Sequence, residues 1–454
     1  MRRSSIGVVA AALGLVVMSM SPAVWGQSTA GKFYLGADVS ALASGGRSGG
    51  GGFAGFARGR GPTTAQAATP PATSPAVSVA GRGSARGSRG GPPAPYNESG
   101  VEGTEYGIML KHGWNGFRLR VFVDPVRQAG TPQNSLANTL PLAKAIKDAG
   151  GVFMLDIHYS DTWADPQHQE TPPAWRDLDA DALEKKVEEY SREVITQFKA
   201  AGAMPEMVQV GNEITGGLLW PLGHLHVPDS PVKQEANERI QNVYMQPYDQ
   251  ARVWSNVTRF IKAGIRGVKA GAGNTPPQII LHIDCGGDWQ VTQWWFDHIA
   301  AARVEYDIIG QSFYPRYHGT LPMLQENMVQ CAKRYNKPFM VVETGYPQTG
   351  GEQMMSSAQT IANPVLSAAD PQAKGFYQWP GTPQGQLQFM VDLVNTVKRA
   401  PNGMGVWAWA PEARGGGNGM WNADGTPAPS IFVLDHLEDL KSNPMSRLLA
   451  PQSP

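Results

Sequence analysis

Two glutamates, Glu213 and Glu343, stand where a parallel α/β fold places catalytic groups. An apolar run that predicts a strand precedes each of them and a loop follows, so each carboxylate is held at the carboxyl end of a strand. Two facing carboxylates can hydrolyse a glycosidic bond, because one protonates the leaving oxygen while the other attacks or shields the anomeric carbon. A single glutamate at a strand end is explained equally well by a structural hydrogen bond, but the pair favours catalysis.

Further polar and aromatic residues follow the other apolar runs, and in a barrel they converge on the same mouth as the two glutamates. His158 and His282 are interpreted either as walls of the subsite at the cleaved bond or as structural histidines. Trp163 and Trp220 are either sugar platforms or loop anchors. The other candidates for substrate binding at this mouth are Asp161, Asn212, Tyr314 and Trp409, the last as the floor of that subsite.

The elements that position these residues follow from eight short apolar runs that alternate with amphipathic stretches. The runs predict strands at residues 33–38, 116–122, 152–158, 207–211, 279–283, 308–313, 339–343 and 405–410, and helices at 140–149, 182–201, 253–269, 321–335 and 386–398. A doubly wound open sheet alternates too, but no Gly-x-Gly-x-x-Gly turn follows the first strand. The predicted fold class is therefore α/β, a (β/α)₈ TIM barrel within one catalytic domain at residues 27–450.

Composition excludes several other classes of protein. Lys+Arg and Asp+Glu both number 38, so the chain has no net charge and is not expected to bind nucleic acid. The two cysteines, Cys285 and Cys331, are too few for a disulfide framework, and their spacing relative to histidine is not that of a zinc site. Whether they form a disulfide with each other is left open. The 13 Trp and 13 Tyr residues suit sugar faces as well as packing. We expect a monomer whose partner is a polysaccharide.

The N-terminal residues 1–26 resemble a signal peptide. Arg2 and Arg3 precede an apolar run at residues 6–20, which is shorter than the ~20 residues of a membrane-spanning helix, and small residues follow it. Cleavage is expected near Gly26, with an uncleaved N-terminal anchor as the alternative. No later stretch is apolar enough to span a bilayer, so the mature protein is expected to be secreted or periplasmic.

Residues 44–95 form a low-complexity insertion rich in Gly, Pro, Ala, Ser, Thr and Arg. Such a composition buries too little apolar surface to build a core, so we expect this segment to be disordered. Its arginines, from Arg47 to Arg89, have no acidic partner within the segment. Contacts with an acidic polymer are the alternative to a simple solvated insertion.

Seven stretches carry a resemblance to a known family of enzymes. In these stretches, and over residues 32 to about 433 apart from the insertion, the chain resembles the arabinogalactan endo-β-1,4-galactanases of glycoside hydrolase family 53. The resemblance implies a clan A barrel and endo-acting, retaining hydrolysis of β-1,4-galactosidic bonds in galactan and type I arabinogalactan. It also implies that Glu213 is the acid/base and Glu343 the nucleophile. The stretches are residues 36–40, 158–166, 209–215, 217–221, 307–315, 342–347 and 382–386.

Neighbours of the two glutamates gain expected roles from this resemblance. Asn212 matches the asparagine that hydrogen-bonds the sugar 2-hydroxyl, a contact that strengthens in the transition state. Tyr314 is expected to hold the nucleophile through its hydroxyl, and Arg118 or Arg120 to keep that carboxylate ionised. Only one of the two arginines is expected to face inward, because side chains two apart on a strand differ in depth, and Arg120 is preferred.

The chain departs from the family pattern after the eighth predicted strand. The usual Trp-Glu-Pro sequence has Ala410 in place of the glutamate. The role of that glutamate is therefore either missing or taken over by Glu412. Bacterial members can hold calcium between the seventh and eighth strands, but Glu352 and Asp370 are the only acidic residues at 350–380. A structural calcium ion is compatible with the sequence but not indicated, and no cofactor is expected.

Two alternatives to a galactanase stay open at this point. One is a clan A hydrolase that acts on another β-linked polysaccharide such as mannan or cellulose, since the arrangement of the two carboxylates is shared and only the subsite walls differ. The other is a carbohydrate-binding barrel without turnover, which would use the aromatic residues alone. The presence of both glutamates speaks against the second alternative.

Overall fold

The structure of the protein is a computed structural model that describes residues 32–44, 95–125, 133–228, 230, 232, 250–349 and 379–437. The expected signal peptide, residues 45–94 of the expected insertion, and both Glu352 and Asp370 lie outside these described residues. Within the described ranges, no helix is both long and apolar enough to cross a membrane.

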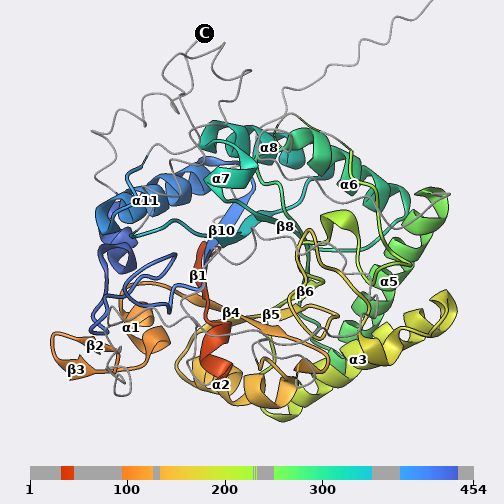
Figure 1. Ribbon diagram of the computed structural model, residues 1–454, viewed down its shortest axis with the longest axis horizontal. Coiled ribbons are helices and arrows are strands. Elements are labelled where there is room, and N and C mark those ends of the chain that lie inside the picture. The colour runs from red at the N-terminus through yellow and green to blue at the C-terminus, as the bar shows by residue number, and fades with distance from the viewer. Residues whose placement is uncertain are drawn as a thin grey trace, which may run out of the picture. The chain divides into compact units, whose positions relative to one another are not determined.

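Eight parallel strands close into a barrel in the spatial order β1-β10-β9-β8-β7-β6-β5-β4. All eight predicted strands are present, and their ends differ from the prediction by at most two residues, so the predicted (β/α)₈ barrel is confirmed. Figure 1 looks into the ring of strands, with the helices outside it. The barrel strands are β1 (Tyr34–Asp38), β4 (Gly116–Val121), β5 (Val152–Ile157), β6 (Met207–Val210), β7 (Gln278–Ile283), β8 (Ile308–Ser312), β9 (Phe339–Thr344) and β10 (Gly403–Trp409); a separate hairpin pairs β2 (Asn97–Glu98) with β3 (Val101–Glu102).

The helices between the strands begin at side-chain caps. Ser135, Asp179, Asp288 and Thr320 each accept a hydrogen bond from a backbone N–H of the first turn. The cap at Ser135 starts its helix four residues before the predicted residue 140, and α1, α6 and α7 were not among the predicted helices. The helices are α1 (Glu105–Lys111), α2 (Leu136–Asp148), α3 (Ala180–Ala200), α5 (Gln250–Ala272), α6 (Trp289–Ala301), α7 (Pro315–His318), α8 (Leu321–Tyr335) and α11 (Pro383–Arg399), with 3₁₀ turns η1 (Ser40–Ser44), η3 (Pro173–Trp175), η4 (Ile214–Gly216) and η5 (Pro429–His436).

The barrel interior changes from apolar to polar along the strands. Because side chains alternate between the two faces of a strand, Met154 and Asp156 of β5 both point inward, at successive depths. Trp407 of β10 fills the apolar layer, where Gly36 leaves room for it: a Cβ at Gly36 would lie 2.2 Å from the indole nitrogen. The apolar layer therefore closes the barrel below the polar one, and consists of Met154, Met207, Ile280, Ile308, Met340, Val342 and Trp407.

The pairing of the cysteines, left open by the sequence, is decided by the structure. Cys285 follows β7 and Cys331 lies in α8, and both are buried free thiols. The barrel is held together by packing and hydrogen bonds rather than by a bridge between these two residues.

Candidate active site

The two glutamates meet at the carboxyl end of the barrel. Glu213 directly follows β6 and its turn, while Glu343 lies near the end of β9. One carboxylate oxygen from each, together with a ring nitrogen of His282, lie within 4.8 Å of one another. Retaining glycosidases hold their carboxyl groups roughly 5–5.5 Å apart, whereas inverting enzymes need about 6.5–9.5 Å to admit a water molecule. Carboxylate oxygens this close together favour the retaining arrangement over the inverting one.

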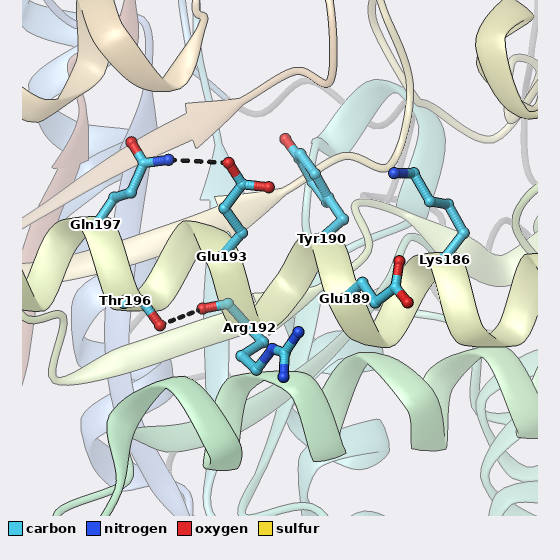
Figure 2. A pocket seen from close by; sticks show the side chains of 7 residues that line it. All are labelled: Lys186, Glu189, Tyr190, Arg192, Glu193, Thr196 and Gln197. Carbon is cyan, nitrogen blue, oxygen red and sulfur yellow. Dashed lines mark hydrogen bonds between the residues drawn. The ribbon is translucent and has the colours of Figure 1, made fainter.

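A shallow pocket on the outer face of α3 offers a contrast. Figure 2 shows that its lining side chains all project from this one helix, with Lys186 and Arg192 among Glu189 and Glu193. Gln197 donates to Glu193 at 3.1 Å, which is a pairing along the helix surface. The pocket has the mixed charge of a solvated helix face, so the chemistry lies at the mouth of the barrel instead.

Two donors to Glu343 favour its ionised form. The Tyr314 hydroxyl donates to Oε1 at 2.8 Å, which is the contact expected from the sequence, and the Arg118 guanidinium donates to Oε2 at 3.1 Å. Arg118 is itself fixed, since it pairs with Asp38 at 2.6 Å and with Asp156 at 2.8 Å. Charge-assisted bonds of this kind favour the ionised form of a carboxyl group.

The preference for Arg120 over Arg118 was wrong, and so was the expectation that only one of them faces inward. Both guanidinium groups are buried, because inward residues two apart on β4 occupy successive depths of the same interior. Arg118 lies at the depth of Glu343. Arg120 lies nearer the mouth, where it donates to Asn134 at 3.1 Å and its guanidinium carbon is 4.1 Å from the ring centroid of Trp163.

Glu213 is held by neutral groups. Its backbone N–H donates to Nδ1 of His282 at 3.4 Å, so that Nε2 of this neutral ring carries the proton. Nε2 lies 2.9 Å from the hydroxyl oxygen of Ser312, and that hydroxyl donates to Oε1 of Glu213 at 2.5 Å. Burial and the nearby Arg118 lower the pKa of His282 well below its ordinary value, which keeps the ring neutral. This chain of bonds holds the Glu213 carboxyl group through Oε1.

The electrostatics separate the roles of the two carboxyl groups. Burial, reinforced by the charges of Glu343 and Asp284, raises the pKa of Glu213 well above its ordinary value. Burial also raises the pKa of Glu343, to about 7, but Arg118 and the Tyr314 hydroxyl oppose that rise. Glu213 therefore keeps its proton to higher pH, as an acid must, and Glu343 is the group that ionises first.

Two tryptophans flank the mouth. Trp163, in the loop after β5, and Trp409, at the end of β10, are both partly exposed, and their ring centroids lie 6.1 Å apart. The Arg120 guanidinium covers one side of Trp163 and leaves the rest of the ring available. These positions suit aromatic walls against which a sugar packs.

Three other predicted substrate contacts are buried and serve the protein instead. Asp161 is 1% exposed and accepts the backbone N–H of Asp124 at 3.0 Å, which ties two loops together. Trp220 stacks on His224 at 3.8 Å and donates its indole N–H to the Gly216 carbonyl, so it is a loop anchor rather than a platform. His282 is fully buried behind Glu213, so its interpretation as a subsite wall is corrected to a support of the acid/base.

His158 and Asn212 are part of the hydrogen-bonded network around Arg118 and Asp156. His158 accepts the Ala164 N–H on Nδ1 at 3.0 Å and lies 2.9 Å from Asp156 through Nε2, which fits the structural interpretation. Arg118 donates to Oδ1 of Asn212 at 2.6 Å, and Nδ2 of Asn212 donates to the Ala164 carbonyl at 2.7 Å. The contact of Asn212 with a sugar 2-hydroxyl stays a prediction.

The carboxylates and His282 are also the one group of described residues with spacing suited to a metal ion. Their hydrogen bonds do not fit that use, however. Nδ1 of His282 already accepts the Glu213 N–H, and Nε2 lies against Ser312. A metal ion would have to displace the contacts that orient the acid/base.

Glu412 is a third buried carboxyl group near the mouth. It is 4% exposed, and its Oε2 has no hydrogen-bond partner among the described residues. Burial and the charge of Asp38 raise the pKa of Glu412 to about 8, although Arg120 opposes this rise. Its main electrostatic neighbours are Asp38 and Arg120 rather than Glu343 or Glu213.

Sequence reasoning missed several supports of the site. Ser312 lies in one of the seven stretches that carry the family resemblance, but nothing in the sequence around a serine at a strand end indicates its hydrogen-bond partner. Asp284, two residues after His282, shared the strand-end signal and was not selected. Gln169 lies in a loop, where an amide gives no periodic signal at all.

Comparison with known proteins decides the family. The sequence model of "Glycosyl hydrolase family 53" matches residues 34–439. The chain belongs to glycosyl hydrolase family 53. It is 31% identical to an arabinogalactan endo-β-1,4-galactanase of Thermothelomyces thermophilus, over 67% of this chain and 80% of the relative. It is 34% identical to a probable arabinogalactan endo-β-1,4-galactanase A of Aspergillus terreus, over 67% of this chain and 76% of the relative.

Solved structures of the family agree with this result. One of two fungal β-1,4-galactanases superimposes with a TM-score of 0.60 at 28% identity, over 75% of this chain and 94% of that one. The family 53 catalytic domain of Ignisphaera aggregans gives a TM-score of 0.61 at 26% identity, over 76% of this chain and 91% of that one. The protein is therefore a glycoside hydrolase of family 53.

Proposed function

We propose that the protein cleaves β-1,4-galactosidic bonds within galactan and type I arabinogalactan, with retention at the anomeric carbon. The observation that carries the reaction type is the approach of the Glu213 and Glu343 carboxylates to within 4.8 Å at the barrel mouth. The substrate class is supported by the family and by the galactanase names of the relatives.

The proposed reaction has two steps, and both use the same pair. In the first, a Glu343 oxygen attacks the anomeric carbon while Glu213 gives its proton to the glycosidic oxygen, so the old C–O bond breaks and a glycosyl ester forms. In the second, Glu213 is a carboxylate and takes a proton from water. That water attacks the anomeric carbon, and Glu343 leaves as an anion. Two inversions give net retention.

Arg118 and Tyr314 support the nucleophile in both steps. They stabilise the Glu343 carboxylate before attack, and their positions allow them to stabilise it again as the ester breaks. Ser312 holds one oxygen of Glu213 while the other delivers the proton. Asn212, Trp163 and Trp409 are proposed to contact the sugar.

The test is an assay of purified protein on unbranched β-1,4-galactan beside mannan, cellulose and arabinan. We expect galactan alone to lose viscosity faster than reducing ends appear, which is the mark of internal cleavage. Proton NMR of the first products should show the β-anomer. Preference for mannan or cellulose would replace the substrate class, and an initial α-anomer would contradict retention.

We further propose that the reaction needs no cofactor or metal. Two carboxyl groups supply both the proton and the nucleophile, and the hydrogen bonds of His282 oppose a metal ion between them. Overnight dialysis against EDTA should leave the rate of galactan cleavage within about twofold of the untreated protein. A loss restored by added calcium would show that the enzyme does need this ion.

The last part of the proposal concerns where the protein acts and in what form. We propose export by the N-terminal signal peptide, with cleavage near Gly26, and action as a monomer outside the cytoplasm. N-terminal sequencing of protein recovered from the culture fluid or periplasm tests the first point. Light scattering on a sizing column tests the second, and a mass twice that of the chain would contradict it.

A further inference from the structure

The loop between β5 and α3 reaches the backbone of the acid/base through one buried side chain, Gln169. Its amide nitrogen lies 2.7 Å from the carbonyl oxygen of Asn212, 3.4 Å from that of Glu213 and 3.1 Å from that of Asp165. The residue is 2% exposed. Only the nitrogen end of a carboxamide donates, so three carbonyl oxygens around it fix which way the side chain points.

Gln169 is itself held in place from its backbone. Its carbonyl accepts the Trp220 N–H at 2.7 Å, and the hydroxyl of the nearby Thr171 donates to the Trp220 carbonyl at 2.8 Å. Asp165 and His168 exchange two backbone hydrogen bonds, which closes the turn before Gln169. The amide is therefore presented by a rigid loop rather than by a mobile one.

The backbone that Gln169 contacts is strained. Glu213 has φ +47° and ψ +46°, a left-handed conformation that side chains other than glycine adopt rarely. Such a strained residue persists only where its surroundings impose the conformation. The residue in this conformation is the one whose carboxylate oxygen lies within 4.8 Å of one of Glu343.

Contacts on both sides impose this conformation. On the N–H side, Glu213 donates to His282. On the carbonyl side, Gln169 contacts the peptide groups that precede and follow Glu213, and Ala164 of the same loop accepts the side-chain amide of Asn212. Without Gln169, the carbonyl side of the turn loses its two side-chain donor contacts.

We infer that Gln169 is a positioning residue that holds the acid/base Glu213 in its strained conformation and so sets the direction of proton delivery. The inference rests on the proposed role of Glu213. A misplacement of about 1 Å at a catalytic group can cost roughly 10²-fold in rate. The loss falls on the step that needs the proton, because Glu343 is held separately by Arg118 and Tyr314.

The test compares Gln169→Leu and Gln169→Glu with Gln386→Leu. Gln386 is a matched control: it is fully buried, and its amide nitrogen contacts three carbonyl oxygens, of Tyr346, Asn418 and Gly419, at 2.7–3.2 Å. Gln169→Leu keeps the bulk and removes the donors. Gln169→Glu keeps the shape and also removes them at neutral pH, so either folded variant decides the question.

Two aryl β-glycosides that the wild type cleaves provide the readout, one with a poor leaving group and one with a dinitrophenolate leaving group. We expect the Gln169 variants to lose about 10–100-fold in kcat/KM with the poor leaving group and less than about threefold with the good one, because kcat/KM reports formation of the glycosyl-enzyme and a dinitrophenolate needs no protonation in that step. Gln386→Leu should lower the melting temperature and change both substrates equally.

An equal loss on both glycosides in the Gln169 variants, as in the control, would overturn the inference, and so would unchanged rates on both. This readout is separate from the substrate proposal. Failure of the wild type on galactan would refute the galactanase activity, whereas the ratio between the two leaving groups would still judge Gln169.

Discussion

The two sides of the barrel mouth hold chemically identical groups in opposite ways. On the β4 and β9 side, Glu343 is gripped by a guanidinium and a phenol, with two buried aspartates behind the guanidinium. Glu213 follows β6, and its carboxyl group accepts the hydroxyl of Ser312 at the end of β8. Its backbone N–H donates to the neutral imidazole of His282 on β7, and the nearby charges are those of Glu343 and Asp284.

The difference shows how one fold makes an anion and an acid from the same residue type. A fixed cation and a donor favour the charged form of Glu343, whereas burial among carboxylates favours the protonated form of Glu213. Since the pair is close, the two titrations depend on each other, and the pH profile of the enzyme reports the pair as a whole. Substitutions on either side test whether this contrast decides the roles.

The largest effects are expected from the carboxylates themselves. Glu343→Gln should lower activity on every substrate by roughly 10⁴-fold or more, because no other group is placed to form the glycosyl ester. Glu213→Gln should lose roughly 10²–10⁴-fold on galactan but still form the glycosyl-enzyme from a dinitrophenyl glycoside. Mass spectrometry after a mechanism-based fluorosugar inactivator checks this, and a label on a residue other than Glu343 would reverse the assignment.

A smaller effect is expected when the nucleophile loses one donor. The Tyr314 hydroxyl lowers the pKa of Glu343, so Tyr314→Phe should raise that pKa and move the acidic limb of kcat/KM to higher pH, with a loss of about 10–100-fold at the optimum. Tyr346→Phe is the matched control, because this buried hydroxyl donates to the Trp379 carbonyl instead. If both variants keep the acidic limb of the wild type, Tyr314 does not tune the nucleophile.

The opposite limb should respond to Ser312→Ala. The Ser312 hydroxyl lowers the pKa of Glu213, so its removal should move the alkaline limb upward, with a loss of about 3–10-fold from a less well oriented acid. Ser430→Ala removes a buried hydroxyl that donates to Gln386 at 2.5 Å, away from the pair, and should leave both limbs in place. An alkaline limb that stays where it is in the wild type would show that Ser312 does not tune Glu213.

Much of this contrast was predictable, because a barrel places strand ends together whatever the loops do. The apolar runs before Glu213 and Glu343 located both strands, and the parallel topology then required the two side chains to meet. Alternation along β4 gave the direction of Arg118 and Arg120 but not their depth, since depth depends on the register with β1 and β5. That is why the wrong arginine was preferred.

Other features of the site depend on contacts that no local pattern records. Whether Trp220 faces sugar or its own loop depends on His224 and Gly216, which are near in sequence but meet it only in the folded turn. Gln169 contacts residues more than 40 positions away through a side chain in an irregular loop. The contacts of Trp220 and Gln169 are determined by loop packing, whereas the positions of the two glutamates are determined by the order of the strands.

The smallest effect on activity is expected at Glu412, which tests whether a raised pKa alone marks a catalytic group. Its pKa is raised to about 8 by burial and Asp38, yet it lies outside the pair. We expect Glu412→Gln to change kcat by less than about twofold, because the neutral amide mimics the protonated acid. A larger loss, with the leaving-group dependence of Glu213→Gln, would place Glu412 in the machinery of proton transfer.

The effect of Glu412→Gln on stability should instead be large and depend on pH. Between the ordinary glutamate pKa of about 4.3 and about 8, the native protein binds a proton that the unfolded chain has released, so stability falls as pH rises through this window. The amide has no proton to lose and escapes this fall. The melting temperatures of the two proteins should therefore be similar near pH 4 and diverge up to about pH 8. The corresponding difference in the free energy of unfolding is of the order of a few kcal/mol, since one pKa unit corresponds to about 1.4 kcal/mol. A constant difference between the two melting curves from pH 4 to pH 9 would show that Glu412 is already ionised in the folded barrel, balanced by Arg120.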